Sequence, residues 1–527
     1  MNIIFCTSPF QVLVAREIAK ATGEKFFGIY LKMSQDSRQK IYAEKMSEFC
    51  EDFLFIEDKH WPEKLKNKLE NIKIEKFYLA SLDNPVALSI FNYNSMHLFT
   101  FDDGSTSVIS PNMYTEYTDR KVAKNGLTLQ HVINLSQGHY TIFENNTVFP
   151  VEKLIKISFN PGPEDFVRAT NGKRVKVFLG QALGACIDEK DIIITKKLTK
   201  KALESLGDAL YYQHPRVFVD VEGVETVQSD KCFEEEIYEL LAKYEFVEVY
   251  GFYSTSLLLT KDIPGVSVHS FRTFLTTNEA KILSSYGIES TDLSLSSLTV
   301  DVVMPVYNSE KTVADAIESV LNQTYKNFRL IIVDDGSLDA TEEICKKYLS
   351  DPRVNYYKIL HGGISRALNT GISHVTAKYI ARQDSDDEWM PWHLDYLLYE
   401  LEINDKLDII GSKVIDDKAK MDSGIRRREY YNLFGEKLWL ELAYRNVFNH
   451  STVIYKKSAY EKAGKYDSQC DGFEDWHLWA RMVTKDNALV VNTITSYYRV
   501  ADKKARGMIF RSRLAKSRGL RLDDVLE

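Results

Sequence analysis

The stretch YIARQDSDDEW at residues 379–389 passes from an apolar run directly into a cluster of acids. Such a run predicts a buried strand, with the acids just beyond its end. In an extended segment Asp384 and Asp386 place their carboxylates on the same side, close enough to hold one hard divalent cation. Such a cation is most useful where a diphosphate is bound or expelled. A solvated acidic turn is the alternative, because turns favour Asp and Ser.

The bulk properties of the chain predict a globular protein of several domains. Its 527 residues are too many for one ordinary core, which predicts two or three domains. A hydrophobic content of 44% and a charged content of 27% are typical of soluble globular proteins. The net charge of −8 argues against a general nucleic-acid binder, so no nucleic-acid partner is expected. The six cysteines are scattered without a Cys-x-x-Cys pair, which suits a reducing cytosol and gives no support for a structural zinc site.

The two ends of the chain bear on its location. The N-terminus enters an apolar strand directly, and no apolar run approaches the roughly 18 residues of a membrane span, so we expect a cytoplasmic protein. The tail at residues 501–527 is basic, with apolar residues interspersed. It fits a helix lying on an anionic membrane surface, on the inner face of the cytoplasmic membrane, and it fits an ordinary solvated terminal helix equally well.

The first half opens as a doubly wound α/β domain does. Residues 2–6 predict a strand and residues 10–21 a helix, with Ser8 as its N-cap and Pro9 at its first position. In such domains ligands bind outside the carboxyl ends of the strands. Polar or small residues follow four further apolar runs: Asp102 and Asp103 after 97–101, Gly180 after 173–179, His214 and Pro215 after 208–212, and Ser254 and Thr255 after 246–250. Each signal is weak alone, because Asp-Asp-Gly is more often a turn than a site.

Taken in this order, the motifs of the first half resemble the bacterial lipooligosaccharide sialyltransferases of glycosyltransferase family 52. The resemblance spans nearly all of residues 1 to about 280 and rests on short motifs: IIFC at 3–6, FQ at 10–11, FYLASL at 77–82, TFDDG at 100–104, HYTIF at 139–143, HPR at 214–216 and YGFYS at 250–254. It implies a GT-B-like fold and transfer of sialic acid from CMP-sialic acid without a metal cofactor.

The resemblance also implies roles for the polar residues of the first half. Gly180 and Pro215 would line the substrate site, and His214 would protonate or hydrogen-bond the phosphate of the CMP leaving group. Ser254 and Thr255 would hold that phosphate through hydroxyls and backbone N–H groups. The acceptor hydroxyl needs a base, and a carboxylate at a strand end can act as one.

One difference from the family pattern leaves the identity of the catalytic base undecided. The family places an acid shortly after the strand that ends in Leu-Gly, but here Gly180 is followed by Gln181. The base is therefore Asp188, Asp102 or Asp103. Two alternatives follow: the first half is a docking or glycan-binding module, or it transfers a different sugar such as glucose.

The second half begins after a stretch rich in small and polar residues, which places a domain boundary near 290–298. A strand follows from residue 299, and then a helix with Ser309 as its cap and an apolar face at positions 313, 316, 317, 320 and 321. The next strand, 328–333, ends in Asp334, Asp335 and Gly336. Acids again stand at the carboxyl edge of a sheet.

From residue 300 to about 498 the chain resembles the family 2 glycosyltransferases of the GT-A fold. The matching motifs are PVYN at 305–308, LNQTY at 321–325, VDDGS at 333–337, LNTGI at 368–372, YIARQDSDD at 379–387, HSTV at 450–453 and EDWHLW at 474–479. Such an ordered set is unlike a chance match to one motif. The resemblance implies a nucleotide-sugar donor, usually a UDP-sugar.

The family 2 resemblance assigns expected roles. Asp384 and Asp386 would hold Mg²⁺ or Mn²⁺ against the diphosphate. Arg382 would contact the donor or form a structural ion pair. Asp475 would take the acceptor proton, with Glu474 as the competing candidate, in an inverting displacement. The base and ribose of the donor would be bound by Pro305, Tyr307, Gly336 and one of Asp334 and Asp335.

The sequence therefore predicts an α/β chain with a GT-B-like region at 1–290, a GT-A domain at 298–500 and a basic tail at 501–527. The predicted function is a bifunctional glycosyltransferase that builds a bacterial lipooligosaccharide or capsule. The C-terminal domain would add a hexose or N-acetylhexosamine and the N-terminal region a sialic acid. The expected partners are nucleotide-sugar donors and a glycan or lipid-linked acceptor, and a homodimer is left open.

Overall fold

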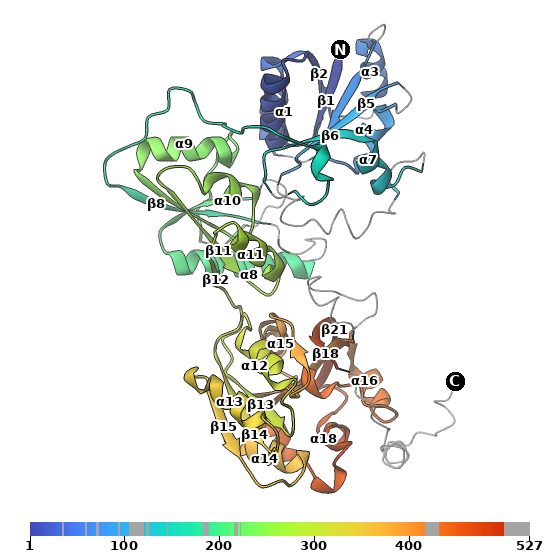
Figure 1. Ribbon diagram of the computed structural model, residues 1–527, viewed down its shortest axis with the longest axis vertical. Helices are drawn as coiled ribbons and strands as arrows, with labels where there is room; N and C mark the ends of the chain where they lie inside the picture. Colours follow the sequence, from blue (N-terminus) through green and yellow to red (C-terminus); the bar gives the residue numbers. More distant parts are fainter. Residues whose placement is uncertain are drawn as a thin grey trace. The chain divides into compact units, whose positions relative to one another are not determined.

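The computed structural model describes residues 1–33, 36–57, 61–69, 73–92, 95–104, 121–122, 126–144, 146–181, 183, 189–214, 220–221, 223–416 and 432–499. Asp188, Pro215 and the basic tail lie outside these residues. The chain divides into two compact units, drawn from blue to green and from yellow to red in Figure 1. The N-terminal unit comprises Met1–Phe271 and Glu279–Thr291, and the C-terminal unit comprises Arg272–Asn278 and Asp292–Glu527.

The first sheet of the N-terminal unit is parallel throughout its described strands. Its order is β3 (Cys50–Ile56), β2 (Phe26–Leu31), β1 (Asn2–Cys6), β4 (Lys76–Leu79), β5 (His97–Phe101), β6 (Ser136–Thr141) and β7 (Leu154–Lys156). The helices are α1 (Pro9–Thr22), α2 (Arg38–Lys45), α3 (Trp61–Leu69), α4 (Pro85–Ile90) and α7 (Leu129–Leu135). In β1, Ile3 and Phe5 enter one core cluster and Ile4 and Cys6 another, so both faces of the sheet are covered.

Helix α1 begins as its sequence predicts. The Ser8 hydroxyl accepts a hydrogen bond from the Gln11 N–H at 3.3 Å, and Pro9 occupies the first turn. Gly23 ends the helix with a left-handed φ of 65°, which costs glycine little. This turn from β1 into α1 puts Ser8 and Pro9 at the carboxyl edge of the first sheet.

The second sheet of the N-terminal unit has the order β12 (Ser290–Asp292), β11 (Val266–Arg272), β10 (Phe246–Gly251), β8 (Arg174–Leu179) and β9 (Ala209–Tyr212). Strands β11, β10, β8 and β9 pair in parallel. The accompanying helices are α8 (Glu189–Leu206), α9 (Phe233–Lys243), α10 (Thr255–Thr260) and α11 (Thr277–Ser285). The N-terminal unit thus holds two parallel sheets, each with its own helices.

The C-terminal unit is built on one mixed sheet. Strands β15 (Val354–Lys358), β14 (Phe328–Asp334), β13 (Val300–Val306) and β16 (Tyr379–Arg382) are parallel. The order continues with β20 (Ile454–Lys456), β18 (Ile409–Ile415), β21 (Ala488–Tyr497) and β17 (Glu388–Trp389), and β19 (Leu433–Phe434) pairs with β21. The helices are α12 (Val313–Leu321), α13 (Thr341–Lys347), α14 (Ile364–Ser373), α15 (His393–Ile403), α16 (Gly435–Glu441), α17 (Lys457–Lys462) and α18 (Glu474–Met482).

Helix α12 begins later than the sequence predicted. Its first residue is Val313 and its N-cap is Thr312, so the expectation that Ser309 caps it is wrong. The Ser309 hydroxyl instead lies 2.7 Å from the Ser385 hydroxyl, between Asp384 and Asp386 in sequence. The apolar face is otherwise as expected, with Val313, Ala316, Ile317 and Val320 buried and Leu321 half-buried.

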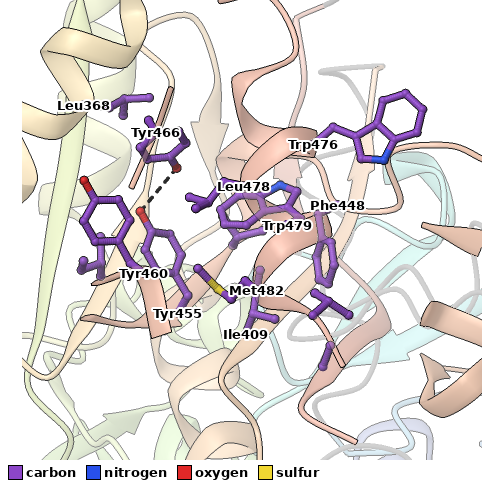
Figure 2. Close-up of a cluster of buried hydrophobic side chains, with 14 of the residues drawn as sticks. Leu368, Ile409, Phe448, Tyr455, Tyr460, Tyr466, Trp476, Leu478, Trp479 and Met482 are labelled. Carbon is purple, nitrogen blue, oxygen red and sulfur yellow. Dashed lines mark hydrogen bonds between the residues drawn. The ribbon is translucent and has the colours of Figure 1, made fainter. Parts of the chain in front are cut away.

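Helix α18 is anchored by an aromatic cluster (Figure 2). Trp479 is fully buried, and its ring lies 5.4 Å from Tyr455 and 6.4 Å from Tyr466, in both cases edge to face. Such aromatic contacts add to the stabilisation that burial already provides. Because Tyr455 belongs to β20, this packing fixes the helix on the sheet and holds its first turn in place.

Within the residues that the structure describes, every helix is too short or too polar to traverse a bilayer.

Candidate active sites

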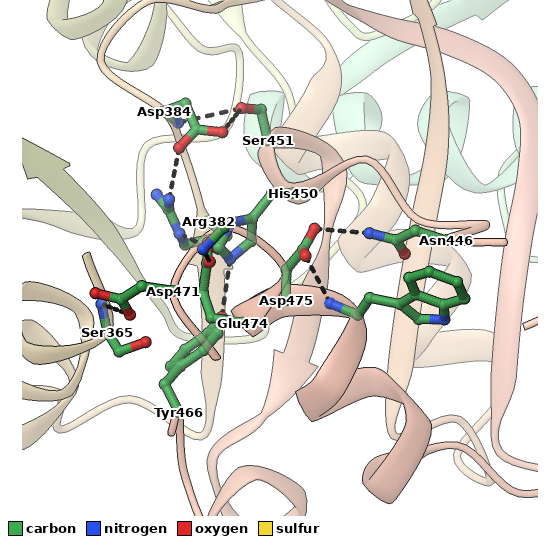
Figure 3. A network of polar contacts seen from close by, with 12 residues as sticks. Ser365, Arg382, Asp384, Asn446, His450, Ser451, Tyr466, Asp471, Glu474 and Asp475 are labelled. Atoms are coloured by element: carbon green, nitrogen blue, oxygen red, sulfur yellow. Dashed lines mark hydrogen bonds and ion pairs between the residues drawn. The ribbon is translucent and has the colours of Figure 1, made fainter. Parts of the chain in front are cut away.

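The acidic cluster of the C-terminal unit lies where β16 ends. Asp384 Oδ1 accepts a hydrogen bond from Arg382 Nη2 at 2.6 Å, and Asp384 Oδ2 accepts one from Ser451 Oγ at 2.9 Å (Figure 3). Although desolvation opposes ionisation, the Arg382 guanidinium and His450 hold the pKa of Asp384 at about 2. Asp384 is therefore a carboxylate at neutral pH.

Two more acids follow Asp384 in the same turn. Asp386 is half-buried, whereas Asp387 is buried and accepts hydrogen bonds from Ser451 Oγ at 2.5 Å and from the Arg499 N–H at 3.0 Å. Hard divalent cations prefer carboxylate oxygens. The carboxylate oxygens at this edge of the sheet, with Asp384 ionised and Asp386 beside it, therefore suit Mg²⁺ or Mn²⁺ as ligands.

Arg382 forms a buried ion pair with Asp384. Its side chain is completely buried, and it donates to Asp384, to His450 Nε2 at 3.1 Å and to the Val303 carbonyl at 3.2 Å. No part of the guanidinium is exposed to a ligand. The guanidinium thus orients Asp384 and neutralises its charge.

Asp475 and Glu474 occupy the first turn of α18. Asp475 Oδ2 accepts a hydrogen bond from Asn446 Nδ2 at 2.7 Å, and Asp475 Oδ1 accepts one from the Trp476 N–H at 2.6 Å. Desolvation and the neighbouring Glu474 carboxylate raise the pKa of Asp475 to about 7. A carboxylate with a pKa near the working pH suits a general base.

Glu474 differs from Asp475 in its surroundings. Its Oε2 accepts a hydrogen bond from the Gly472 N–H at 2.6 Å, which closes the turn before the helix. Burial raises the pKa of Glu474. Asp384 contributes to the raised pKa of both Glu474 and Asp475, because its negative charge is near them. The acids of β16 and α18 therefore belong to one site, as Figure 3 shows.

The residues expected to bind the base and ribose of the donor lie at the carboxyl ends of β13 and β14. Asp334 is fully buried and accepts hydrogen bonds from Tyr356 Oη at 2.6 Å and the Ser337 N–H at 2.7 Å. Asp335 accepts from the Gly362 and Gly363 N–H groups, both at 2.9 Å. Both acids thus shape the backbone that a nucleotide would meet.

The exposed part of this region is formed by two stacked aromatic rings. Pro305 is buried, but Tyr307 is 44% exposed and stacks on His361 at 4.4 Å. Gly336 has φ +77°, and a Cβ added there would lie 2.9 Å from the His361 backbone nitrogen, so this close approach needs glycine. Sequence reasoning missed His361, whose one signal was the Gly-Gly pair that follows it.

The N-terminal unit contains a cavity of about 590 Å³ lined by residues that follow strands of both of its sheets. Asp103 and Gly104 line it from the first sheet, and Gly180, His214, Ser254 and Thr255 line it from the second. Gly180 packs closely, since an added Cβ would lie 3.1 Å from the His214 backbone nitrogen, which is a tight contact. Among the site residues predicted for the first half and described by the structure, all except Asp102 therefore line one cavity.

The two neighbouring acids after β5 have different environments. Asp102 is completely buried, contacts His139 Nε2 at 3.1 Å and accepts a hydrogen bond from the Ile142 N–H at 2.7 Å. It does not line the cavity, so it is the weaker of the two as a base. Asp103 lines the cavity and accepts hydrogen bonds from Gln11 Nε2 at 2.5 Å and Ser81 Oγ at 3.1 Å.

The cavity also contains residues that sequence reasoning missed. Arg38 of α2 and Lys231 before α9 add cationic groups to its lining, and Glu234 of α9 adds a buried acid. Ser256 Oγ donates to Glu234 Oε1 at 2.7 Å, and burial raises the pKa of Glu234. These residues belong to helices and loops distant in sequence, so no local pattern marks them.

Comparison with protein families gives one match for each half of the chain. Residues 23–274 match glycosyltransferase family 52, and residues 301–464 match glycosyl transferase family 2. Both resemblances found in the sequence are therefore confirmed. With this match, the mixed α/β C-terminal unit is GT-A-like.

Relatives fall into the same two groups. An N-acetyllactosaminide alpha-2,3-sialyltransferase of Haemophilus influenzae is 27% identical over 287 residues, covering 52% of this chain and 92% of that protein. The O-antigen biosynthesis glycosyltransferase WbnJ of Escherichia coli is 32% identical over 192 residues, covering 35% of this chain and 72% of that protein. The chain spans 57%, 64% and 66% of three further relatives of the C-terminal half.

Solved structures show only a weak likeness. The structure of S. aureus TarS with UDP-GlcNAc has a TM-score of 0.34 and 16% identity, over 40% of this chain and 61% of that one. A likeness at this level carries no argument about the chain.

Proposed function

Because this chain belongs to the glycosyltransferases, with a family 52 region in one half and a family 2 region in the other, we propose that it is a bifunctional enzyme building a bacterial surface glycan. The C-terminal unit transfers a hexose or N-acetylhexosamine from a UDP-sugar. The N-terminal unit transfers sialic acid from CMP-sialic acid. The observation that carries the proposal is that each unit brings its own set of sequence-predicted residues together.

In the C-terminal unit the donor diphosphate lies against Asp384 and Asp386. A bound Mg²⁺ or Mn²⁺ would neutralise the charge that develops on the leaving diphosphate. Tyr307 and His361 offer an aromatic surface to the base, beside the loop that Asp335 shapes. Asp475 takes the proton of the acceptor hydroxyl as that oxygen attacks the anomeric carbon from the face opposite the diphosphate, which inverts the configuration.

Removing the metal should slow sugar transfer by the C-terminal unit and leave transfer by the N-terminal unit unchanged. We expect Asp386→Ala, or excess EDTA on the wild type, to lower transfer from the UDP-sugar by at least about 100-fold, because the diphosphate charge is then uncompensated. Transfer of sialic acid should be unchanged. Product formation is measured by mass spectrometry with each donor separately, and Asp405→Ala, at an exposed position, is the matched control. Full activity of Asp386→Ala in EDTA would show that the metal assignment is wrong.

Replacing Asn446 should shift the pH dependence of sugar transfer by the C-terminal unit. Its amide hydrogen bond lowers the pKa of Asp475, so Asn446→Ala should raise that pKa by about one unit above its value near 7. The base works only when deprotonated, so the rising, acidic limb of the kcat/KM profile should move to higher pH. Rates at alkaline pH should change little. Asn404→Ala, an exposed site, serves as control, and an unshifted profile in Asn446→Ala would contradict the role of Asp475 as base.

In the N-terminal unit the cavity between two parallel sheets fits a GT-B-like arrangement, in which donor and acceptor meet between the two sheets. His214 protonates or hydrogen-bonds the CMP phosphate, and Ser254 and Thr255 hold the same phosphate. Asp103, held by Gln11 and Ser81, is our choice for the base, and Asp188 is the other candidate. This half needs no metal, because the leaving group carries one phosphate and the cavity supplies cationic and hydroxyl groups.

A further inference from the structure

Three side chains with metal-ligand chemistry meet where the segment before α18 packs beside the first residues of that helix. Asp467, Cys470 and His477 each offer one ligand atom, and these atoms all lie within 4.8 Å of one another. Within the described ranges, no other group of three or more His, Cys, Asp or Glu side chains meets this criterion. We propose that Asp467, Cys470 and His477 form a binding site for a thiophilic divalent cation such as Zn²⁺.

The chemistry of the three ligands separates this site from the acidic cluster. Thiolate sulfur, imidazole nitrogen and carboxylate oxygen together bind Zn²⁺ in a four-coordinate shell, with water as the fourth ligand. Mg²⁺ and Mn²⁺ prefer oxygen ligands, which Asp384 and Asp386 provide. The two kinds of cation are therefore expected to sort between the two places. The spacing Asp-x₂-Cys-x₆-His matches no common zinc motif, so no zinc site was predicted from the sequence.

The backbone holds the three ligands in place without a metal. The Cys470 N–H donates to the Asp467 carbonyl at 2.9 Å, the Phe473 N–H to the Cys470 carbonyl at 3.0 Å, and the His477 N–H to the Phe473 carbonyl at 3.0 Å. Ser365 Oγ of α14 also donates to the Asp467 carbonyl, at 3.2 Å. Little ordering is therefore left to oppose the binding of a cation.

Among the residues that the structure describes, Arg481 is a nearby cationic group that opposes a cation. It lies close enough to act electrostatically on Cys470 and His477. Its guanidinium donates to the carbonyls of His477, Ala463 and Lys465 at 3.1, 2.5 and 2.7 Å, so its charge is directed at those oxygens. A divalent cation bound by one thiolate and one carboxylate makes a neutral group, which limits its repulsion by Arg481.

A bound cation would cross-link α18 to the segment that precedes it. Asp467 and Cys470 stand before α18, whereas His477 lies in its second turn. A cation bound by all three joins this preceding segment to the helix whose first turn holds Glu474 and Asp475. Because the cation binds the folded state, it should stabilise the C-terminal unit against unfolding. The inference does not depend on the proposed transfer reactions.

The test is a titration of the full chain with Co²⁺, a spectroscopic substitute for Zn²⁺, in excess Mg²⁺. We expect a cobalt–thiolate charge-transfer band that saturates at one Co²⁺ per chain. Cys470→Ser should abolish the band, and His477→Ala should weaken Co²⁺ binding at least about tenfold, as ligand loss exceeds the loss of an outer-shell partner. Asp386→Asn is the matched control, since it alters an oxygen site and should leave the band intact.

A second measurement guards against a variant that binds poorly because it is misfolded. Zn²⁺ should raise the melting temperature of the wild type, while Cys470→Ser and His477→Ala melt as the metal-free wild type does and show no increase. No thiolate band in the wild type, or a band that persists in Cys470→Ser, would overturn the proposal. A Zn²⁺-induced rise that survives in both variants would overturn it too.

Discussion

Asp475→Asn should lower sugar transfer by the C-terminal unit by about 10²- to 10⁴-fold, the range that a general base contributes. The amide keeps the size of the side chain and can still accept from Asn446 Nδ2, but it cannot take the acceptor proton. Donor affinity should stay near that of the wild type, because Asp475 does not lie against the diphosphate in our proposal. The measurement is kcat for transfer from the UDP-sugar, together with donor binding by calorimetry.

The neighbouring acid provides the comparison for this prediction. Glu474→Gln keeps the acceptor that closes the turn at the Gly472 N–H, so we expect a much smaller loss of kcat. If Glu474→Gln removes the activity and Asp475→Asn does not, the competing assignment is correct and Glu474 is the base. Loss of donor binding in Asp475→Asn would place this side chain on the donor instead.

His214→Ala should remove sialic acid transfer while leaving transfer from the UDP-sugar unchanged. His214 lines the N-terminal cavity beside Gly180 and Gln213, where a CMP phosphate would leave. Loss of a proton donor or hydrogen bond at the leaving group is expected to cost about 10²- to 10⁴-fold in kcat. The assay is release of CMP and formation of the sialylated product by the full chain.

A matched histidine separates catalysis from folding in this experiment. His269, on β11, stacks on Tyr250 and does not line the cavity, so His269→Ala should leave sialic acid transfer near the wild-type rate. Activity that survives in His214→Ala would favour the docking-module alternative for the N-terminal half, and a wild type that uses UDP-glucose but not CMP-sialic acid would favour a glucose donor.

The local pattern of the sequence was enough to predict several of the elements and their ends. Strand β1 and the cap of α1 stand where the apolar run and the Ser-Pro pair predict them, because both depend on neighbouring residues only. The acids at 384 and 386 follow a buried strand, as the run before them indicates. The motifs of both halves also identified both glycosyltransferase families.

Choices between adjacent residues needed the tertiary structure. Both faces of the first sheet are buried, so alternation alone could not tell whether Asp102 or Asp103 faces the cavity. The complete burial of Arg382 depends on Val303 and His450, which lie on other elements. Helix α12 begins at Val313 with Thr312 as its N-cap, and the Ser309 hydroxyl instead contacts Ser385, 76 residues away.

The acidic cluster illustrates the division between the two kinds of information. The position of carboxylates just after β16 could be predicted from the sequence, since chain order and strand periodicity are local properties. The fold was needed to show that Asp475, with Asn446 beside it, lies near these carboxylates and has a pKa near 7. The reason is physical: charge and desolvation act through space, and folding sets which groups are near one another.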